Sequence, residues 1–258
     1  MASEIRVEEG PFGPEVRPLD GPVRHTVLYV HGDPRLGGTP HDALPMAREL
    51  ARATGSLVVC ARYRPAFPTA LDDVGAAYAY CRDRAPVAVV GKRLGGALTA
   101  GLLLRLRDGD EALPTCAALV TPLLDLTLDT PSLLLNAAAD RTTDVAALHR
   151  RAASYAGPTP RTEPLLSPLH GNLHGLPPVQ LHASGTDVLL DDALAFAARA
   201  ARSGVTVDLR VYEDMSAQGL AQPAATADFL RAHDATRSSS LRLDEPDEHG
   251  DTLHRNQK

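Results

Sequence analysis

The most informative stretch of this sequence pairs a tight glycine turn with an unexpected cation. Residues 86–104 form an apolar, β-rich run up to Gly91, followed by an Ala/Leu-rich helical segment. A strand, a sharp glycine-flanked turn and a helix are the layout of a nucleophile elbow, whose usual motif is G-x-S-x-G. Here the five residues are Gly-Lys-Arg-Leu-Gly, so Arg93 occupies the serine position. The glycines allow the turn, but no hydroxyl is present there to attack an acyl carbon.

Arg93 changes the chemistry that this turn could support. A guanidinium stays protonated and offers only hydrogen-bond donors, so it cannot act as a nucleophile or a base. At a helix N-terminus and beside Lys92, it could hold a carboxylate, an enolate or a phosphate. Lys92 could in principle form a Schiff base if it were desolvated, but a solvated lysine is the simpler interpretation.

Composition excludes several classes of function. The chain has 258 residues and a net charge of −6, without the concentrated basic face that nucleic-acid binding requires. No apolar run approaches the roughly 20 residues that span a membrane, and residues 1–10 do not resemble a signal peptide. The three cysteines are odd in number and widely spaced, which favours buried thiols in a reducing compartment. We therefore expect a cytoplasmic protein.

Strand-like and helix-like segments alternate along the chain. We expect strands at 5–9, 16–18, 26–31, 56–62, 87–91, 115–121, 179–184 and 206–212, and helices at 42–54, 70–82, 94–107, 144–155, 191–203 and 221–233. This alternation predicts an α/β fold with a mostly parallel central sheet and helices on both faces. We expect one domain over residues 1–233 and a polar, flexible tail over residues 234–258.

Several motifs follow one another in a familiar order. They are the Y-V-H-G that ends a strand at 32, the Y-R with F-P at 63–68, the elbow at 91–96, T-P-L-L-D-L-T at 121–127, G-T-D-V-L-L-D-D at 185–192 and V-Y-E-D-M at 211–215. Over about residues 25–233 the chain resembles the hormone-sensitive-lipase-like esterases of the α/β-hydrolase superfamily. The resemblance implies an α/β-hydrolase fold, here with a reduced cap.

The same resemblance assigns roles to individual residues and implies a degenerate catalytic triad. Asp187 matches the catalytic acid, Arg93 takes the nucleophile position, and Ala217 or Gln218 takes the histidine position. We predict Arg93 and Asp187 as catalytic residues. Predicted substrate-binding residues, several of them from the altered oxyanion motif His-Gly-Asp-Pro, are His31, Gly32, Asp33, Tyr63, Lys92, Leu94 and Gln218.

Two interpretations of Arg93 remain open at this level. It could hold an anionic ligand at the floor of the pocket, or it could pair with Asp187 and fill the vacated triad. A second pair is expected between Asp33 and Arg62, where the charges are exchanged relative to the family, and we favour a structural role for it.

The altered triad shapes the functional hypotheses. Superfamily members that lost the triad often serve in specialised metabolism, so the resemblance implies a repurposed, non-hydrolytic enzyme with a cyclase, elimination or lyase-type step, and we favour this hypothesis. Its substrate would be small, partly apolar and possibly anionic. The alternative is a non-catalytic pseudohydrolase that binds a ligand or partner, and the least favoured is a residual hydrolase in which Asp187 activates water.

Further ligands and assembly follow more weakly from the sequence. We expect no cofactor and no metal, because His170 and His174 lie in a Gly/Pro-rich loop without an evident third ligand. The chain is expected to be a monomer or a homodimer, and the family resemblance implies that a homodimer would form through the strand at 206–212.

Overall fold

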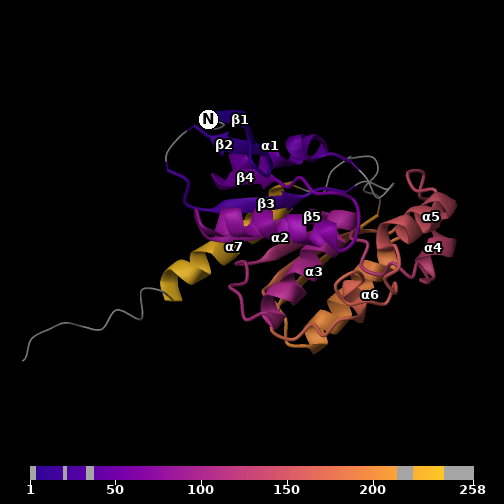
Figure 1. Cartoon of the computed structure of the whole chain (residues 1–258). Helices are drawn as coiled ribbons and strands as arrows, with labels where there is room; N and C mark the ends of the chain where they lie inside the picture. Colours follow the sequence, from indigo (N-terminus) through magenta and orange to yellow (C-terminus); the bar gives the residue numbers. More distant parts are fainter. Residues whose placement is uncertain (1–3, 20–21, 33–37, 214–222, 241–258) are drawn as a thin grey trace, which may run out of the picture.

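The computed structural model describes residues 4–19, 22–32, 38–213 and 223–240. Across these residues, eight strands form one sheet in the order β1-β2-β4-β3-β5-β6-β7-β8 (Figure 1). The strands β1 and β2 run antiparallel to their neighbours and the others are parallel, as predicted. Their bounds are Ile5–Gly10 (β1), Gly13–Pro18 (β2), Thr26–Val30 (β3), Leu57–Cys60 (β4), Val87–Lys92 (β5), Ala117–Val120 (β6), Val179–Ser184 (β7) and Val207–Tyr212 (β8).

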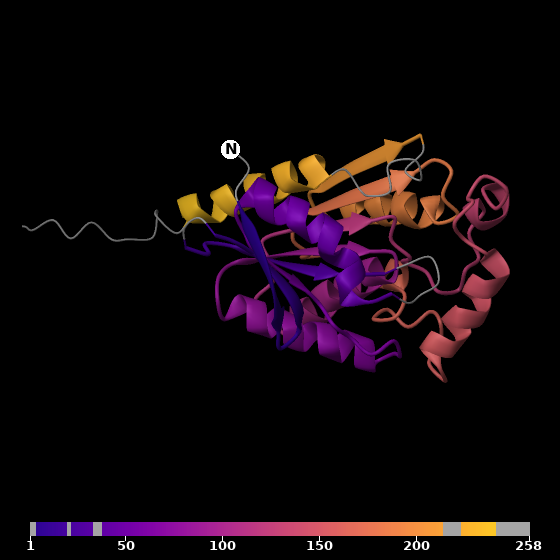
Figure 2. The same cartoon turned by 90° about the horizontal axis from the view of Figure 1, so that it is seen from above.

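Helices cover both faces of the sheet. Helices α1 and α7 lie side by side on one face (Figure 2), and α2, α3 and α6 pack on the other. The bounds are Leu44–Thr54 (α1), Thr69–Arg82 (α2), Leu94–Asp108 (α3), Ser132–Leu135 (α4), Val145–Ala156 (α5), Leu190–Arg202 (α6) and Pro223–Ser240 (α7), with 3₁₀ turns η1 (Pro40–Ala43) and η2 (Pro168–His170). The three-layer arrangement confirms the predicted fold class.

The central strands are apolar because both of their faces are covered. In β3, Leu28 and Val30 pack toward α2 and α3, whereas Val27 and Tyr29 pack toward α1 and α7. Successive side chains of a strand point to opposite faces, so a strand between two helical layers needs apolar residues at every position.

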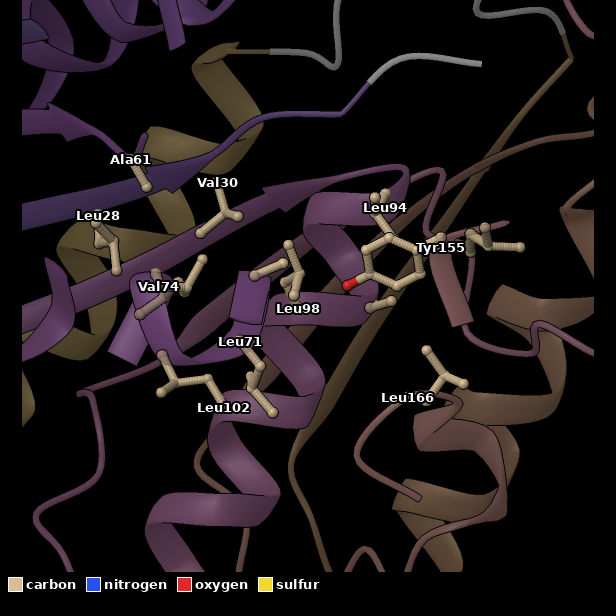
Figure 3. Close-up of a cluster of buried hydrophobic side chains, with 14 of the residues drawn as sticks. Leu28, Val30, Ala61, Leu71, Val74, Leu94, Leu98, Leu102, Tyr155 and Leu166 are labelled. Atoms are coloured by element: carbon tan, nitrogen blue, oxygen red, sulfur yellow. The ribbon is translucent and has the colours of Figure 1, made fainter. Parts of the chain in front are cut away.

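Helix α3, which begins at the predicted site residue Leu94, is buried over most of its length. Its residues from Leu94 to Leu104 are all buried. Figure 3 shows Leu94, Leu98 and Leu102 of α3 in one cluster with side chains of β3 and α2, and with Tyr155 of α5. A helix that is apolar all round must be surrounded, which fixes the start of α3 relative to the sheet.

The strand order identifies where a ligand would bind. From β3 the chain crosses to β4 on one side, and from β4 it returns to β5 on the other side of β3. Ligands in open α/β sheets bind at such a reversal point, beyond the carboxyl ends of the strands. His31 follows β3 and Arg93 follows β5, so both lie at this position.

Some boundaries differ from the prediction. Helix α7 continues past residue 233 to Ser240, because no proline or glycine interrupts residues 234–240. Helix α4 and turn η2 were not predicted, since elements of three or four residues show no hydrophobic period. Among the helices of the described residues, none has the length and apolar character needed to cross a membrane.

A buried carboxyl group joins α6 to the segment after β6. Asp192 is 2 % exposed, and its Oδ2 accepts hydrogen bonds from the backbone N–H groups of Leu124 (2.7 Å) and Asp125 (3.0 Å). Burial raises the pKa of Asp192 from its ordinary value of 3.8 to about 7, and the two backbone donors only partly oppose this rise.

We expect Asp192→Asn to flatten the pH dependence of stability. Because the pKa of Asp192 is raised in the folded state, the folded chain keeps a proton that the unfolded chain has released between pH 3.8 and about 7. This stabilising contribution is complete below the unfolded pKa and is lost as the pH rises through about 7. A tenfold change in proton affinity corresponds to about 1.4 kcal/mol, and asparagine keeps the acceptor without titrating.

Urea unfolding of wild type and variant between about pH 4 and 8 tests this expectation. Asp72→Asn is the control, since the side chain of Asp72 is 63 % exposed. Parallel stability curves for wild type and Asp192→Asn would show that Asp192 does not hold a proton in the folded chain.

Candidate active site

Arg93 sits in a strained turn between β5 and α3. Its backbone angles are φ 52° and ψ −118°, a conformation that residues other than glycine rarely adopt. The turn is held at both ends: the Arg93 N–H donates to the Val120 carbonyl (3.1 Å), and the Arg93 carbonyl accepts from Gly96 (2.9 Å) and Leu123 (3.1 Å). The strand–turn–helix geometry predicted for the elbow is therefore confirmed, and its backbone strain is of the kind found at functional sites.

Glycines allow the backbones of β3, β5 and α3 to approach one another at this turn. A side chain at Gly95 would overlap the carbonyl oxygen of Val30, and one at Gly32 would lie 2.8 Å from the Leu94 nitrogen. At Gly91 it would collide with Gly95. The glycine spacing that suggested the elbow is thus required by close contact between backbones.

The side chain of Arg93 forms a buried ion pair with Asp187. Arg93 Nη1 lies 2.8 Å from Asp187 Oδ1, and the two side chains are 9 % and 6 % exposed. Asp187 follows β7, and its Oδ1 also accepts the backbone N–H of Leu189 (2.8 Å). Of the two interpretations left open by the sequence, the structure contains the ion pair. Among the described residues, both bonds to this carboxylate fall on Oδ1.

Hydrogen bonds from the two ends of α4 hold the loop that carries Asp187 and the first turn of α6. The amide nitrogen of Asn136 donates to the carbonyls of Gly185 (3.0 Å) and Asp187 (2.8 Å). Asp191, in the first turn of α6, accepts from the Ser132 nitrogen at 2.7 Å. Sequence reasoning missed Asn136, because it lies at the end of the short helix α4, where no motif marks it.

The carboxyl end of β3 presents two rings in contact. His31 is buried, and its Nδ1 lies 3.0 Å from the carbonyl of Ala61. The ring of Tyr63 stacks on that of His31, with ring centres 4.5 Å apart, and the Tyr63 hydroxyl donates to the His31 carbonyl (2.8 Å). Of the substrate-binding residues predicted here, His31, Gly32 and Tyr63 therefore lie together beside the elbow.

The remaining predicted residues have different surroundings. The side chain of Leu94 is fully buried in the core, so only its backbone could reach a ligand. Lys92 ends β5 and is half-buried. Asp33 and Gln218 lie outside the described residues.

The pair expected between Asp33 and Arg62 stays a prediction for the same reason, and among the described residues Arg62 contacts Glu9. Its Nη2 donates to Glu9 at 3.0 Å.

No second reactive centre emerges from the other candidates. His170 Nε2 lies 3.1 Å from Asp125, and His174 is exposed. In the part of the chain that the structure describes, no three His, Cys, Asp or Glu side chains gather as metal ligands would. Burial raises the pKa of the Cys60 thiol to about 12, so it is not a thiolate near neutral pH. All three cysteines are buried and unpaired, as predicted.

Comparison with known proteins decides the family. A family profile described as alpha/beta hydrolase fold matches residues 27–218. The chain belongs to this family. This alpha/beta hydrolase is 32% identical over 198 residues to an acetyl-hydrolase of Streptomyces hygroscopicus, a match that covers 74% of this chain and 66% of the relative. It is 33% identical over 213 residues to the carboxylesterase/phospholipase LipF of Mycobacterium tuberculosis, covering 77% of this chain and 57% of LipF. The chain thus spans no more than about two thirds of either relative.

Solved structures agree. An esterase from the bacterial hormone-sensitive lipase family shares 29% sequence identity with a TM-score of 0.81, covering 90% of this chain and 85% of that one. The esterase EstE5, soaked with p-nitrophenyl butyrate, shares 28% identity with a TM-score of 0.83 and the same coverage. The predicted resemblance to hormone-sensitive-lipase-like esterases is confirmed.

The predicted function is wrong. We expected a repurposed, non-hydrolytic enzyme or a non-catalytic pseudohydrolase, but the relatives of this alpha/beta hydrolase are named acetyl-hydrolase and carboxylesterase, and the similar structures are esterases. Nothing in these comparisons supports a cyclase, elimination or lyase-type step, or a place in specialised metabolism. The error came from inferring the reaction from the altered positions, which are Arg93 in place of the nucleophile, Ala217 or Gln218 in place of the histidine, and the altered oxyanion motif, while the elbow and the acid loop are retained.

The elbow should not tolerate a methyl group at position 95. Gly95→Ala is expected to lower the free energy of unfolding by about 2–3 kcal/mol or more, because the backbone carbonyl of Val30 cannot move aside. Gly185→Ala is the matched control, since its nearest atoms would be 3.5 Å away. Equal melting temperatures for the two variants would contradict the tight contact.

Breaking the buried pair from one side should cost more than removing both charges. Arg93→Met is expected to destabilise the fold by about 3–5 kcal/mol, because it leaves Asp187 charged and buried without its cation. The double variant Arg93→Met/Asp187→Asn removes that charge and keeps an acceptor for Leu189, so it should recover most of the loss. Urea denaturation measures both, and an equal loss in the two variants would show that the pair is not coupled.

Proposed function

We propose that this chain hydrolyses esters of small acyl groups at the sheet edge where Arg93 and Asp187 meet. The observation that carries the proposal is the retained elbow. The strained turn at Arg93 follows β5, and its side chain pairs with the buried Asp187 in the loop after β7. Relatives of the chain are named hydrolases and esterases. The acetyl-hydrolase name of one relative supports a short acyl group for the substrate.

Water takes the role of the attacking group in this proposal. A guanidinium has no lone pair to donate to an acyl carbon, so Arg93 cannot form an acyl-enzyme. Among the described residues, the hydrogen bonds to Asp187 fall on Oδ1, which leaves its Oδ2 to accept a proton from water. The water oxygen then bonds to the carbonyl carbon.

The positive end of the site stabilises the charge that develops. As the tetrahedral intermediate forms, negative charge accumulates on the former carbonyl oxygen. Arg93 and the N-terminus of α3 supply a fixed cation and a helix dipole of the right sign. When the C–O bond to the alcohol breaks, the proton held by Asp187 passes to the leaving oxygen. The products are a carboxylic acid and an alcohol, and no other reactant is needed.

Other features of the proposed function stay predictions. A small-molecule substrate, possibly anionic, suits a site with a fixed guanidinium. A cytoplasmic location is supported by the unpaired, buried cysteines. The monomeric or homodimeric state is a separate question that the proposal does not depend on.

Asp187→Asn should abolish most of the hydrolysis. With p-nitrophenyl acetate as substrate, we expect kcat to fall about 100-fold or more, as for loss of a general base. Asparagine retains an acceptor for Arg93 and Leu189 but leaves the buried guanidinium without its counter-charge, so thermal denaturation must show that the variant is folded at the assay temperature. Asp72→Asn is the control, because this exposed carboxylate pairs with Arg105 and takes no part in holding the acid loop.

Two results would overturn the proposal. One is an absence of hydrolysis above the buffer rate in the folded wild-type chain, and the other is an unchanged rate in Asp187→Asn. A fluorophosphonate probe separates the water mechanism from a covalent one, since it labels an activated serine and should leave this chain unlabelled.

A further inference from the structure

An open cavity lies next to the site but is built from other elements. Its volume is about 540 Å³, and its lining includes Phe12, Arg62, Tyr63, Arg64 and Pro65, from the turn between β1 and β2 and the segment after β4. This volume falls within the range of small-molecule sites. None of the residues that line it belongs to the Arg93–Asp187 pair.

Two aromatic side chains in the lining are held in place by their neighbours. Tyr63 is half-buried, with its ring stacked on His31 and its hydroxyl bonded to the His31 carbonyl. Phe12 is also half-buried, and its ring centre lies 5.0 Å from that of Tyr80. A ligand that packs on these rings would not have to order them first, which lowers the entropic cost of binding.

The charged side chains in the lining differ in the number of hydrogen bonds that hold them in ion pairs. Asp73 accepts three hydrogen bonds from Arg64, from its backbone nitrogen (2.9 Å), Nε (2.9 Å) and Nη2 (2.7 Å). These two charges therefore neutralise one another.

Among the described residues, Arg62 makes one weak ion pair at the cavity. Its Nη2 lies 3.0 Å from Glu9 Oε2, with both side chains more than half exposed. Such solvent-exposed pairs contribute little, and Glu9 also contacts His41 at 2.7 Å through Oε1. The backbone of Arg62 is fixed, because its N–H donates to the carbonyl of Phe12 at 2.7 Å. Arg62 is thus a positioned cation that can exchange its partner.

We propose that this cavity binds a small aromatic carboxylate, with the ring against Phe12 and Tyr63 and the carboxylate on Arg62. A guanidinium pairs bidentately with a carboxylate and also packs well against flat rings. The incoming carboxylate replaces Glu9 as the partner of Arg62. This site is distinct from the proposed hydrolytic centre and stands whether or not the chain hydrolyses esters.

Benzoate is the probe, because it carries only the two features required. Titration of the full chain, followed by ligand-observed NMR, should give a dissociation constant of roughly 1–10 mM, as expected for a ligand of this size. Acetate, which lacks the ring, and benzyl alcohol, which lacks the charge, should each bind at least about 5-fold more weakly.

Paired variants make the assignment specific. Arg62→Gln should weaken benzoate binding about 10-fold, and Glu9→Gln should strengthen it about 2- to 5-fold by removing the competitor of the ligand. Phe12→Leu should weaken binding while leaving the charges intact. Matched controls are Arg82→Gln and Glu49→Gln, which break other exposed ion pairs and should leave affinity unchanged.

Three outcomes would overturn the proposal. The first is an absence of benzoate binding at about 20 mM. The second is an affinity that Arg62→Gln does not change. The third is loss of binding in the double variant Arg93→Met/Asp187→Asn with no effect of Arg62→Gln, which would place benzoate at the elbow instead. Thermal denaturation of each variant confirms that the fold persists.

Discussion

The site depends on the close approach of three backbones where β3, β5 and α3 meet. Glycine at positions 32, 91 and 95 removes the atoms that would hold these elements apart. Contact between β3, β5 and α3 restricts the backbone conformation of residue 93. The hydrogen bonds at each end of the turn then hold its φ angle positive. Packing around α3 stabilises this arrangement, because the turn holds about 1–3 kcal/mol of backbone strain that it would otherwise release by relaxing. The elbow is therefore a property of the scaffold and does not depend on which side chain it presents.

The ion pair between Arg93 and Asp187 is likewise fixed by its surroundings. Both groups are nearly excluded from water, so each requires a compensating charge and hydrogen bonds to be tolerated. Asp187 receives them from Arg93 and from the backbone of Leu189, while Asn136 holds the loop from the side of α4. The position of the acid is thus determined by groups on three separate segments. This is why family membership and hydrolytic chemistry can be argued from the surroundings of residue 93 and not from that residue alone.

Much of the architecture was predictable, and the reasons for the failures are physical. The buried strands and the apolar helix α3 follow from their hydrophobic patterns, and the elbow follows from its glycine spacing. The contact of Arg93 with Asp187 was one of two alternatives, since sequence gives no distance between residues so far apart. Asn136 was missed because it acts on backbone carbonyls, which leave no sequence motif. The reaction was predicted wrongly because the altered residues at the nucleophile, histidine and oxyanion positions were given more weight than the retained frame.

Burial of α3 from Leu94 to Leu104 affects how a negative charge is stabilised at the start of the helix. Solvent stabilises a new charge by turning its own dipoles, and that reorientation contributes to the barrier of reactions in water. The peptide dipoles of an enclosed helix already point the right way and have no room to turn elsewhere. A negative group that binds near residue 93 therefore meets an electrostatic field that is already oriented toward it. These peptide dipoles were ordered when the chain folded, before any ligand bound.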